Sequence, residues 1–136
     1  MLLIIILGMP QIYSIKFPSW LRVLGILILM LAAVVILLGI LGLGQSFTLF
    51  PRPLPEGHLV TSGIYGVVRH PLYSAAIFAT LGWALLTSNL LDIGMAAVVF
   101  LFVDLKSRRE EEWLINAYPN YVDYRSRVKK LIPWIY

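Results

Sequence analysis

The sequence predicts an all-α fold: a polytopic membrane bundle of three or four transmembrane helices, with a cytoplasmic helical extension at the C-terminal end. Composition is the first reason. Hydrophobic residues make up 60% of the 136 residues and charged residues 13%, whereas soluble domains are about one quarter charged. The second reason is a charge-free stretch at residues 23–44, about as long as a hydrocarbon core requires. A soluble fold of this size could not bury so much apolar surface, so much of it is expected to face lipid.

The first firm span is expected over residues 20–44. Small residues where other helices can approach closely occur at Gly25, Gly39, Gly42 and Gly44. Residues 1–9 are apolar but too short to span, so three crossings are expected, and a fourth only if this stretch joins a longer helix. A signal peptide is not expected, because no basic region precedes the apolar stretch.

A tight helical hairpin is expected next. Residues 72–87 and 90–105 are apolar, and the polar pair Ser88 and Asn89 separates them. Each segment is near the short limit for crossing a membrane. The second helix is expected to continue to about Asn116, because the residues beyond its apolar part are good helix formers.

Pro119 is expected to end that helix and to open a last one, since proline is tolerated in a first helical turn. Side chains on one face of this last segment are Tyr121, Tyr124, Val128 and Leu131, and cations surround them. An amphipathic segment of this kind is expected to lie in the lipid headgroup region.

Charge placement predicts the topology. Seven of the eleven Lys and Arg residues follow Leu105, and the hairpin places them on the same side as the loop at residues 45–70. With Arg52 and Arg69 that side holds nine cations, against Lys16 and Arg22 on the other. The positive-inside rule therefore predicts a cytoplasmic loop and tail. The basic tail suits a membrane surface better than nucleic acid.

The first polar cluster is the run Arg69-His70-Pro71-x-Tyr73, where the loop enters the hairpin. A helix that starts at Pro71 offers unpaired N–H groups and a positive dipole end. His70 can donate or accept a hydrogen bond, and Tyr73 follows about one turn later. Interfacial anchoring by Arg, Tyr and Pro explains the same spacing equally well.

The second cluster contains three adjacent carboxylates after two arginines. Neighbouring helical residues point about 100° apart, so Glu110 and Glu111 must face different sides. Asp104, Arg108 and Glu111 share one face, and Lys106 shares another with Glu110. A carboxylate here would hold a ligand ammonium or simply pair with arginine, and the residues alone leave both open.

Other chemistries lack support in the sequence. There is no cysteine, so thiolate nucleophiles and thiolate metal sites are excluded. His58 and His70 are the only histidines, and no carboxylate spacing completes a ligand set, so no metal site is expected. Glycine-rich phosphate loops and nucleophile elbows are also missing from the sequence.

The two clusters belong to a longer pattern of spaced segments. These segments are Leu59-Val60-Thr61-Ser62-Gly63-Ile64-Tyr65, Val68-Arg69-His70-Pro71-Leu72-Tyr73, Glu110-Glu111-Glu112-Trp113-Leu114, Tyr121-x-x-Tyr124, and Arg127-Val128 through Ile132-Pro133. With this combination the chain resembles the superfamily of isoprenylcysteine carboxyl methyltransferases and phospholipid methyltransferases. The resemblance implies a single integral membrane domain over residues 1–136, whose cofactor-binding part covers about 47–136 and uses S-adenosylmethionine.

The resemblance also implies roles for individual residues. Those implied to line the cofactor site are Gly57, His58, Leu59, Val60, Tyr65, His70, Pro71, Leu72, Tyr73 and Glu110. Glu110 is expected to hold the charged end of the cofactor. Those expected to act in catalysis are Arg69, Lys106, Arg109 and Glu111. Eukaryotic carboxyl methyltransferases have a substrate-binding arginine one turn before the cofactor glutamate, and here that position is Lys106. Lysine lacks a bidentate grip on carboxylate, and Arg109 is the candidate to compensate.

The predicted function is methyl transfer to a lipophilic acceptor in the membrane, either an isoprenylcysteine-type carboxylate or a lipid headgroup. An amine acceptor must lose a proton, and Glu111 or His70 would be the base. The expected partners are a lipophilic or lipidated substrate and membrane lipids, without nucleic acid. Two alternatives stay open: a nicotinamide-dependent reductase related to membrane sterol reductases, and a non-enzymatic membrane scaffold subunit.

Overall fold

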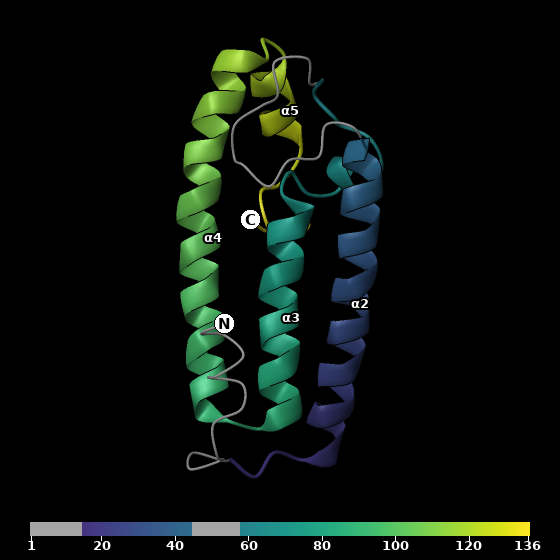
Figure 1. Cartoon of the computed structure of the whole chain (residues 1–136), viewed down its shortest axis with the longest axis vertical. Helices are drawn as coiled ribbons and strands as arrows, with labels where there is room; N and C mark the ends of the chain where they lie inside the picture. The colour runs from purple at the N-terminus through teal and green to yellow at the C-terminus, as the bar shows by residue number, and fades with distance from the viewer. Residues whose placement is uncertain (1–14, 45–57) are drawn as a thin grey trace.

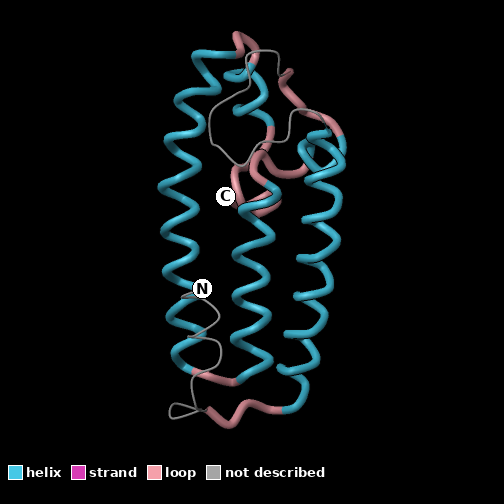
Figure 2. The backbone as a smooth tube through the Cα atoms, in the orientation of Figure 1, coloured by secondary structure: helices cyan, strands magenta, loops and turns pink. Residues whose placement is uncertain are grey.

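The computed structural model describes residues 15–44 and 58–136, and this part of the chain is helical, without strands (Figure 2). The long helices α2, α3 and α4 lie side by side, and the short α5 covers the end of the bundle where α3 begins (Figure 1). The elements are α2 (Ser19–Leu43), the 3-10 turn η2 (Gly63–Gly66), α3 (Pro71–Thr87), α4 (Leu90–Ala117) and α5 (Tyr121–Arg127). The all-α prediction is therefore confirmed for the described residues.

Helix α2 is the clear candidate span of the described part. It has 25 residues and a mean hydropathy of 3.2 in its most apolar window, only 17% of which is buried inside the protein. Helix α3 is also apolar but has 17 residues, and the second half of α4 is charged. The expected number of three or four crossings stays a prediction.

Close backbone contact joins α2 to α3. A Cβ atom built on Gly25 would lie 2.6 Å from the carbonyl oxygen of Gly82, and one built on Gly39 would lie 2.8 Å from Leu72 Cδ2. At Gly25 the neighbouring atom belongs to the backbone, so this crossing needs glycine, whereas at Gly39 the flexible Leu72 side chain can shift. Gly44, by contrast, ends α2 with a φ of 50°, and a Cβ atom built on it would have none of the described residues within 4 Å. The tight packing fixes the start of α3 beside the end of α2.

The α3–α4 hairpin forms where it was predicted. Ser88 adopts a left-handed conformation with a φ of 55°, and the Asn89 side chain accepts a hydrogen bond of 3.0 Å from the Leu91 amide at the start of α4. Asparagine is a favoured N-cap because it satisfies such an unpaired N–H. Helix α4 then continues to Ala117, one residue beyond the predicted end.

The C-terminal segment differs from the helix that the sequence predicted there. Helix α5 begins two residues after Pro119 and ends at Arg127, and the backbone at Val128 is extended. The predicted helix through Leu131 is therefore wrong, and Tyr121 and Tyr124 of its apolar face are buried in the protein. The extended segment instead pairs with residues 68–70, and backbone hydrogen bonds to that loop replace helical ones.

Some predictions fall outside the described residues. The apolar stretch at 1–9 and the Pro-rich loop through residue 57, which includes the predicted cofactor residue Gly57, belong to the undescribed parts.

Candidate active site

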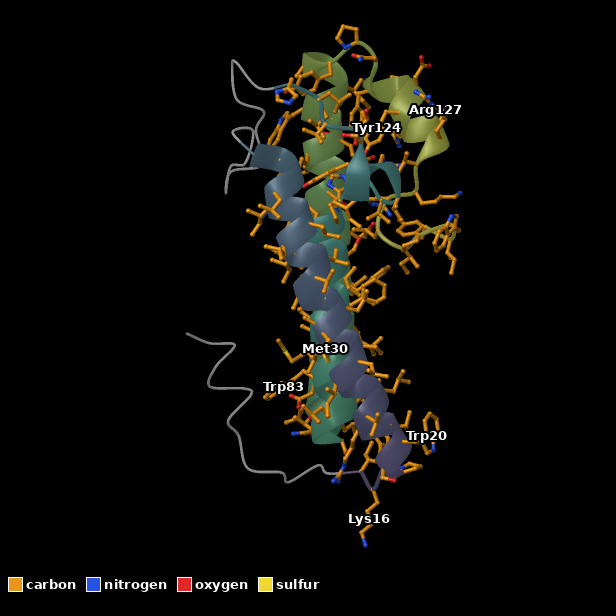
Figure 3. All side chains as sticks on the ribbon, turned by 90° about the vertical axis from the view of Figure 1, so that its right-hand side faces the viewer. Lys16, Trp20, Met30, Trp83, Tyr124 and Arg127 are labelled. Atoms are coloured by element: carbon orange, nitrogen blue, oxygen red, sulfur yellow. The ribbon has the colours of Figure 1, made fainter. Side chains whose placement is uncertain are left out.

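Three elements meet at one end of the bundle: the start of α3, the charged half of α4 and the segment after α5. The amides of Arg69 and His70 donate to the carbonyl oxygens of Lys129 and Lys130 at 2.8 and 3.1 Å. The hydroxyl of Ser74, one turn into α3, donates to the Leu131 carbonyl oxygen at 2.6 Å. Figure 3 shows many polar side chains near this end, where Arg127 is labelled, and mostly apolar ones along the middle of the helices.

Arg69 is at the centre of this junction. Its Nε donates to Glu111 Oε1 at 2.9 Å, and both side chains are buried. Its Nη1 donates to the carbonyl oxygens of Arg125, at 3.0 Å, and Val128. One guanidinium therefore joins α4 to the end of α5. Hydrogen bonds to a buried charge are stronger than neutral ones, and three of them use the Nε and Nη1 groups of Arg69.

His70 lies between the adjacent carboxylates Glu110 and Glu111 of α4. Its Nε2 is 3.1 Å from Glu111 Oε1, and its Nδ1 is 3.9 Å from Glu110 Oε2. Burial would raise the pKa of Glu111, but hydrogen bonds from His70 and Arg69 outweigh it and lower that pKa to about 2. Glu111 is therefore a permanent anion near neutral pH, and its oxygens are occupied by neighbours.

Glu110 has a different environment. Its Oε2 accepts a hydrogen bond of 2.7 Å from the Tyr73 hydroxyl, and its side chain is 24% exposed, compared with 5% for Glu111. The Tyr73 ring stacks on His70 with centroids 5.5 Å apart, and the Lys106 ammonium lies 5.2 Å from the Tyr73 ring centroid. Glu110 is therefore an accessible anion beside the stacked rings of Tyr73 and His70, and the Lys106 ammonium lies near the same tyrosine ring.

The remaining predicted residues are placed as follows. Pro71 is buried at the first position of α3. The hydroxyl of buried Tyr65 donates to the Gly39 carbonyl oxygen at 3.2 Å, which holds η2 against α2. Leu72 packs on the same glycine.

The other predicted residues are more exposed than His70 and Glu111. His58 is exposed, and Leu59 and Val60 are half-buried. Arg109 is exposed, and it forms no ion pair with the part of the chain that the structure describes. The structure thus brings together Arg69, His70, Tyr73, Lys106, Glu110 and Glu111, but does not add Arg109 to this group.

Sequence reasoning missed a second buried ionic group. Lys130 Nζ lies 2.5 Å from Asp104 Oδ1, which also accepts a hydrogen bond of 3.0 Å from the Tyr136 hydroxyl. The expected face shared by Asp104 and Arg108 is confirmed by a contact of 2.9 Å. The sequence around Lys130 did not indicate this ion pair, because its partner Asp104 is 26 residues earlier in the chain.

The fold and this cluster define a helical membrane protein with a polar centre at one end of its bundle. Comparison with known proteins supports this description. The model of the phospholipid methyltransferase family matches residues 20–121, which is most of the chain. The chain belongs to this family, and the superfamily expected from the spaced motifs is confirmed.

The chain is also similar to individual proteins. Protein-S-isoprenylcysteine O-methyltransferase B of Arabidopsis thaliana is 30% identical over 120 residues, which cover 85% of this chain and 61% of the relative. The cobalt-zinc-cadmium resistance protein CzcN of Cupriavidus metallidurans is 34% identical over 76 residues, covering 55% of this chain and 35% of that protein.

A solved structure of the eukaryotic intramembrane Ras methyltransferase, an isoprenylcysteine carboxyl methyltransferase, superposes with a TM-score of 0.78 at 28% identity. The alignment covers 85% of this chain and 43% of that one. The present chain thus spans about three fifths or less of the length of these relatives.

Proposed function

We propose that this protein is an S-adenosylmethionine-dependent methyltransferase that acts on a lipophilic acceptor in the membrane. Family membership and the named relatives support the reaction class. The observation that carries the proposal is the contrast between the adjacent carboxylates: Glu111 is saturated, whereas Glu110 is held by one tyrosine hydroxyl and stays accessible. An accessible carboxylate aligned by a neighbour suits a cationic ligand.

The residues present fit this cofactor. Its ammonium and sulfonium groups are cations, and Glu110 offers a negative charge already oriented by Tyr73. Bound there, the cofactor supplies an electrophilic methyl group. The proposed cofactor site comprises the described residues His58, Leu59, Val60, Tyr65, His70, Pro71, Leu72, Tyr73 and Glu110, together with Gly57.

The surrounding residues would act mainly by positioning. Arg69 and Glu111 hold His70, and His70 in turn stacks on Tyr73. A rigid wall that orients two reactants can lower a barrier without a covalent intermediate. We therefore assign Arg69 and Glu111 as positioning residues rather than groups that touch the substrate.

Lys106 is the proposed contact for the acceptor. It lies beside Tyr73 and one turn from Glu110, where its ammonium would attract an acceptor carboxylate. Such an acceptor is already ionised near neutral pH and needs no base. An amine would need one, and Glu111, with a pKa lowered to about 2, is a poor base. The site therefore favours a carboxylate, and His70 is the remaining base candidate for an amine.

We further propose that three or four helices cross the membrane and that this end of the bundle faces the cytoplasm. Of the ten Lys and Arg residues in the described part of the chain, eight belong to the segments on this side, which agrees with the positive-inside rule. The soluble cofactor would enter from the cytoplasm, and the lipophilic acceptor from the membrane.

The test is a methylation assay with the full chain in liposomes, a methyl-labelled cofactor, and either an S-prenylated cysteine analogue or a membrane lipid extract. A carboxylate acceptor gives a methyl ester, which releases labelled methanol in alkali, whereas an N-methyl product resists alkali. We expect the alkali-labile product. Thermal stabilisation by NADPH but not by adenosylhomocysteine would support the reductase alternative, and unlabelled products throughout would support the scaffold.

A further inference from the structure

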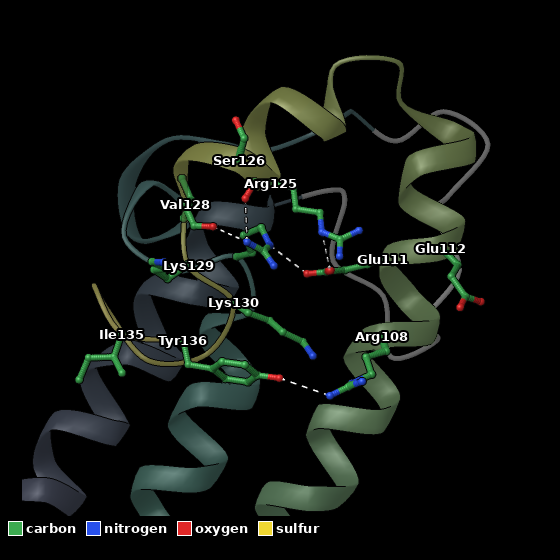
Figure 4. Close-up of a pocket in the computed structure, with 11 residues that line it drawn as sticks. Arg108, Glu111, Glu112, Arg125, Ser126, Val128, Lys129, Lys130, Ile135 and Tyr136 are labelled. Atoms are coloured by element: carbon green, nitrogen blue, oxygen red, sulfur yellow. Dashed lines mark hydrogen bonds and ion pairs between the residues drawn. The ribbon is translucent and has the colours of Figure 1, made fainter.

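A cavity of about 570 Å³ lies beside the Arg69–Glu111 pair, and both residues line it. One wall is the charged half of α4, and the other is the chain from Arg125 to Tyr136 (Figure 4). Neither Tyr73 nor Glu110 is among the described residues that line it. The methyltransferase proposal therefore gives this cavity no role.

The lining of the cavity is strongly cationic. Its charged residues are the cations Arg69, Arg108, Arg125, Lys129 and Lys130 and the carboxylates Glu111 and Glu112. Arg69 and Lys130 are buried and committed to carboxylate partners. The excess positive charge that remains is offered by side chains that reach the opening, and such an excess attracts an anion.

Two guanidiniums face the cavity from opposite walls, Arg108 from α4 and Arg125 from α5 (Figure 4). Their side chains are 63% and 51% exposed. Arg108 uses its Nε on Asp104 at 2.9 Å, and Arg125 places its Nε 3.5 Å from Glu111. Arginine has five N–H donors and suits the oxygens of phosphate, so donors remain on both walls.

The cavity also lies where the protein surface changes from apolar to charged. Along one side of α4 the positions Leu101, Leu105, Arg108 and Glu112 follow one another at helical spacing. Leu101 and Leu105 are exposed apolar residues, and Arg108 and Glu112 line the cavity. An apolar track thus leads along α4 to a cationic pocket.

The opposite rim of the cavity also combines exposed apolar side chains with nearby cations. Ile135 and Tyr136 line it, and the neighbouring Trp134 is 85% exposed, with Ile135 at 75%. Trp134 adopts a φ of 61°, a conformation that residues with a Cβ rarely adopt. Exposed tryptophan beside cations is typical of a membrane–water interface.

We propose that this cavity binds the phosphate of an anionic membrane phospholipid, with the acyl chains against Leu101, Leu105 and the Trp134–Ile135 edge. Arg108 and Arg125 hold the phosphate between them. The site does not depend on methyl transfer, and it anchors this end of the bundle to an anionic membrane surface.

The test uses the full chain in neutral detergent, with bound lipid measured by native mass spectrometry during titration with phosphatidylglycerol or phosphatidylcholine. We expect phosphatidylglycerol to bind at least about tenfold more tightly than phosphatidylcholine, because each basic residue near an anionic surface contributes to the binding free energy. The double variant Arg108→Gln/Arg125→Gln should lose most of this preference, with phosphatidylcholine binding unchanged.

The matched control is Arg22→Gln/Arg127→Gln, which removes the same charge from exposed residues outside the cavity and should retain the preference. Glu112→Gln removes a lining carboxylate and should tighten phosphatidylglycerol binding, a gain that misfolding cannot produce. Equal binding of the two lipids by the wild type, an unaltered preference in the double variant, or displacement of the lipid by millimolar inorganic phosphate would overturn the proposal.

Discussion

The two sides of α4 at its charged end differ in how completely their charges are neutralised. On one side Glu111 is buried and accepts hydrogen bonds from Arg69 and His70. On the other side Glu110 is partly exposed and is bonded by the Tyr73 hydroxyl. The carboxylates are adjacent in sequence, so the helical rotation of about 100° per residue alone separates them.

This difference indicates which charge holds the fold together and which one is available to a ligand. A buried ion pair with all its hydrogen bonds made is costly to break, so the Glu111 side is expected to govern stability. An oriented but accessible carboxylate can exchange water for a cation, so the Glu110 side is expected to govern binding. The substitutions below separate these two properties.

The largest effect on stability is expected for Glu111→Ala. It leaves Arg69 buried without its carboxylate, and breaking such a pair costs about 3–5 kcal/mol. The free energy of unfolding in detergent measures it. Glu112→Ala, an exposed carboxylate one residue later, is the control and should change stability by less than about 0.5 kcal/mol. Equal losses in the two variants would contradict the assigned difference.

The next effect is a dependence on pH. The pKa of Glu111 is lowered from its usual 4.5 to about 2, so its stabilising effect is complete above pH 4.5 and is lost as the pH falls toward 2. The wild type should therefore exceed Glu111→Gln in stability by more at about pH 6 than at about pH 3. Unfolding both proteins at the two pH values tests this, and a constant difference would show that Glu111 titrates normally.

On the Glu110 side of α4 we expect a smaller effect, which concerns the affinity for the cofactor rather than stability. Tyr73→Phe removes the hydroxyl that orients Glu110, a bond of about 1 kcal/mol, so adenosylhomocysteine should bind about fivefold more weakly. The free energy of unfolding should change much less than in Glu111→Ala. Calorimetry measures the affinity, and Tyr118→Phe, a half-buried tyrosine on neither side, serves as the control. Unchanged affinity would remove Tyr73 from the site.

The smallest effect is expected for Arg125→Gln, and it concerns the free energy of unfolding. Arg125 also faces Glu111, but at 3.5 Å and with an exposed side chain, and such pairs contribute less than about 1 kcal/mol. Arg69→Gln in the same unfolding experiment should cost several times more. A loss from Arg125→Gln as large as that from Arg69→Gln would mean that the two arginines share the structural role.

Much of the helical framework could be predicted because local signals were strong. The polar pair Ser88 and Asn89 between apolar runs marked the hairpin, and the absence of breakers extended α4 to Ala117. The helical period alone placed Glu110 and Glu111 on different sides. The motif pattern identified the family, although the roles of individual site residues stay predictions.

The C-terminal segment could not be predicted, and the reason is physical. The spacing of Tyr121 and Tyr124 shows that one face is covered, but not whether lipid or protein covers it. Here protein does: the Tyr124 hydroxyl donates to the Tyr65 carbonyl oxygen, 59 residues earlier, at 2.5 Å. The pairing of Lys129 with Val68 and of Lys130 with Asp104 also joins residues that are not local in sequence.

The central claim is that Glu110 binds the cation of an S-adenosylmethionine-type cofactor. Calorimetric titration of adenosylhomocysteine into Glu110→Gln and Glu112→Gln tests it most directly, because both variants remove one carboxylate charge from the same helical turn. Hydrogen bonds to charged groups contribute about 1.5–3 kcal/mol, so Glu110→Gln should bind about ten- to a hundredfold more weakly than the wild type, and Glu112→Gln should bind like the wild type. Equal affinities in the two variants would contradict the claim.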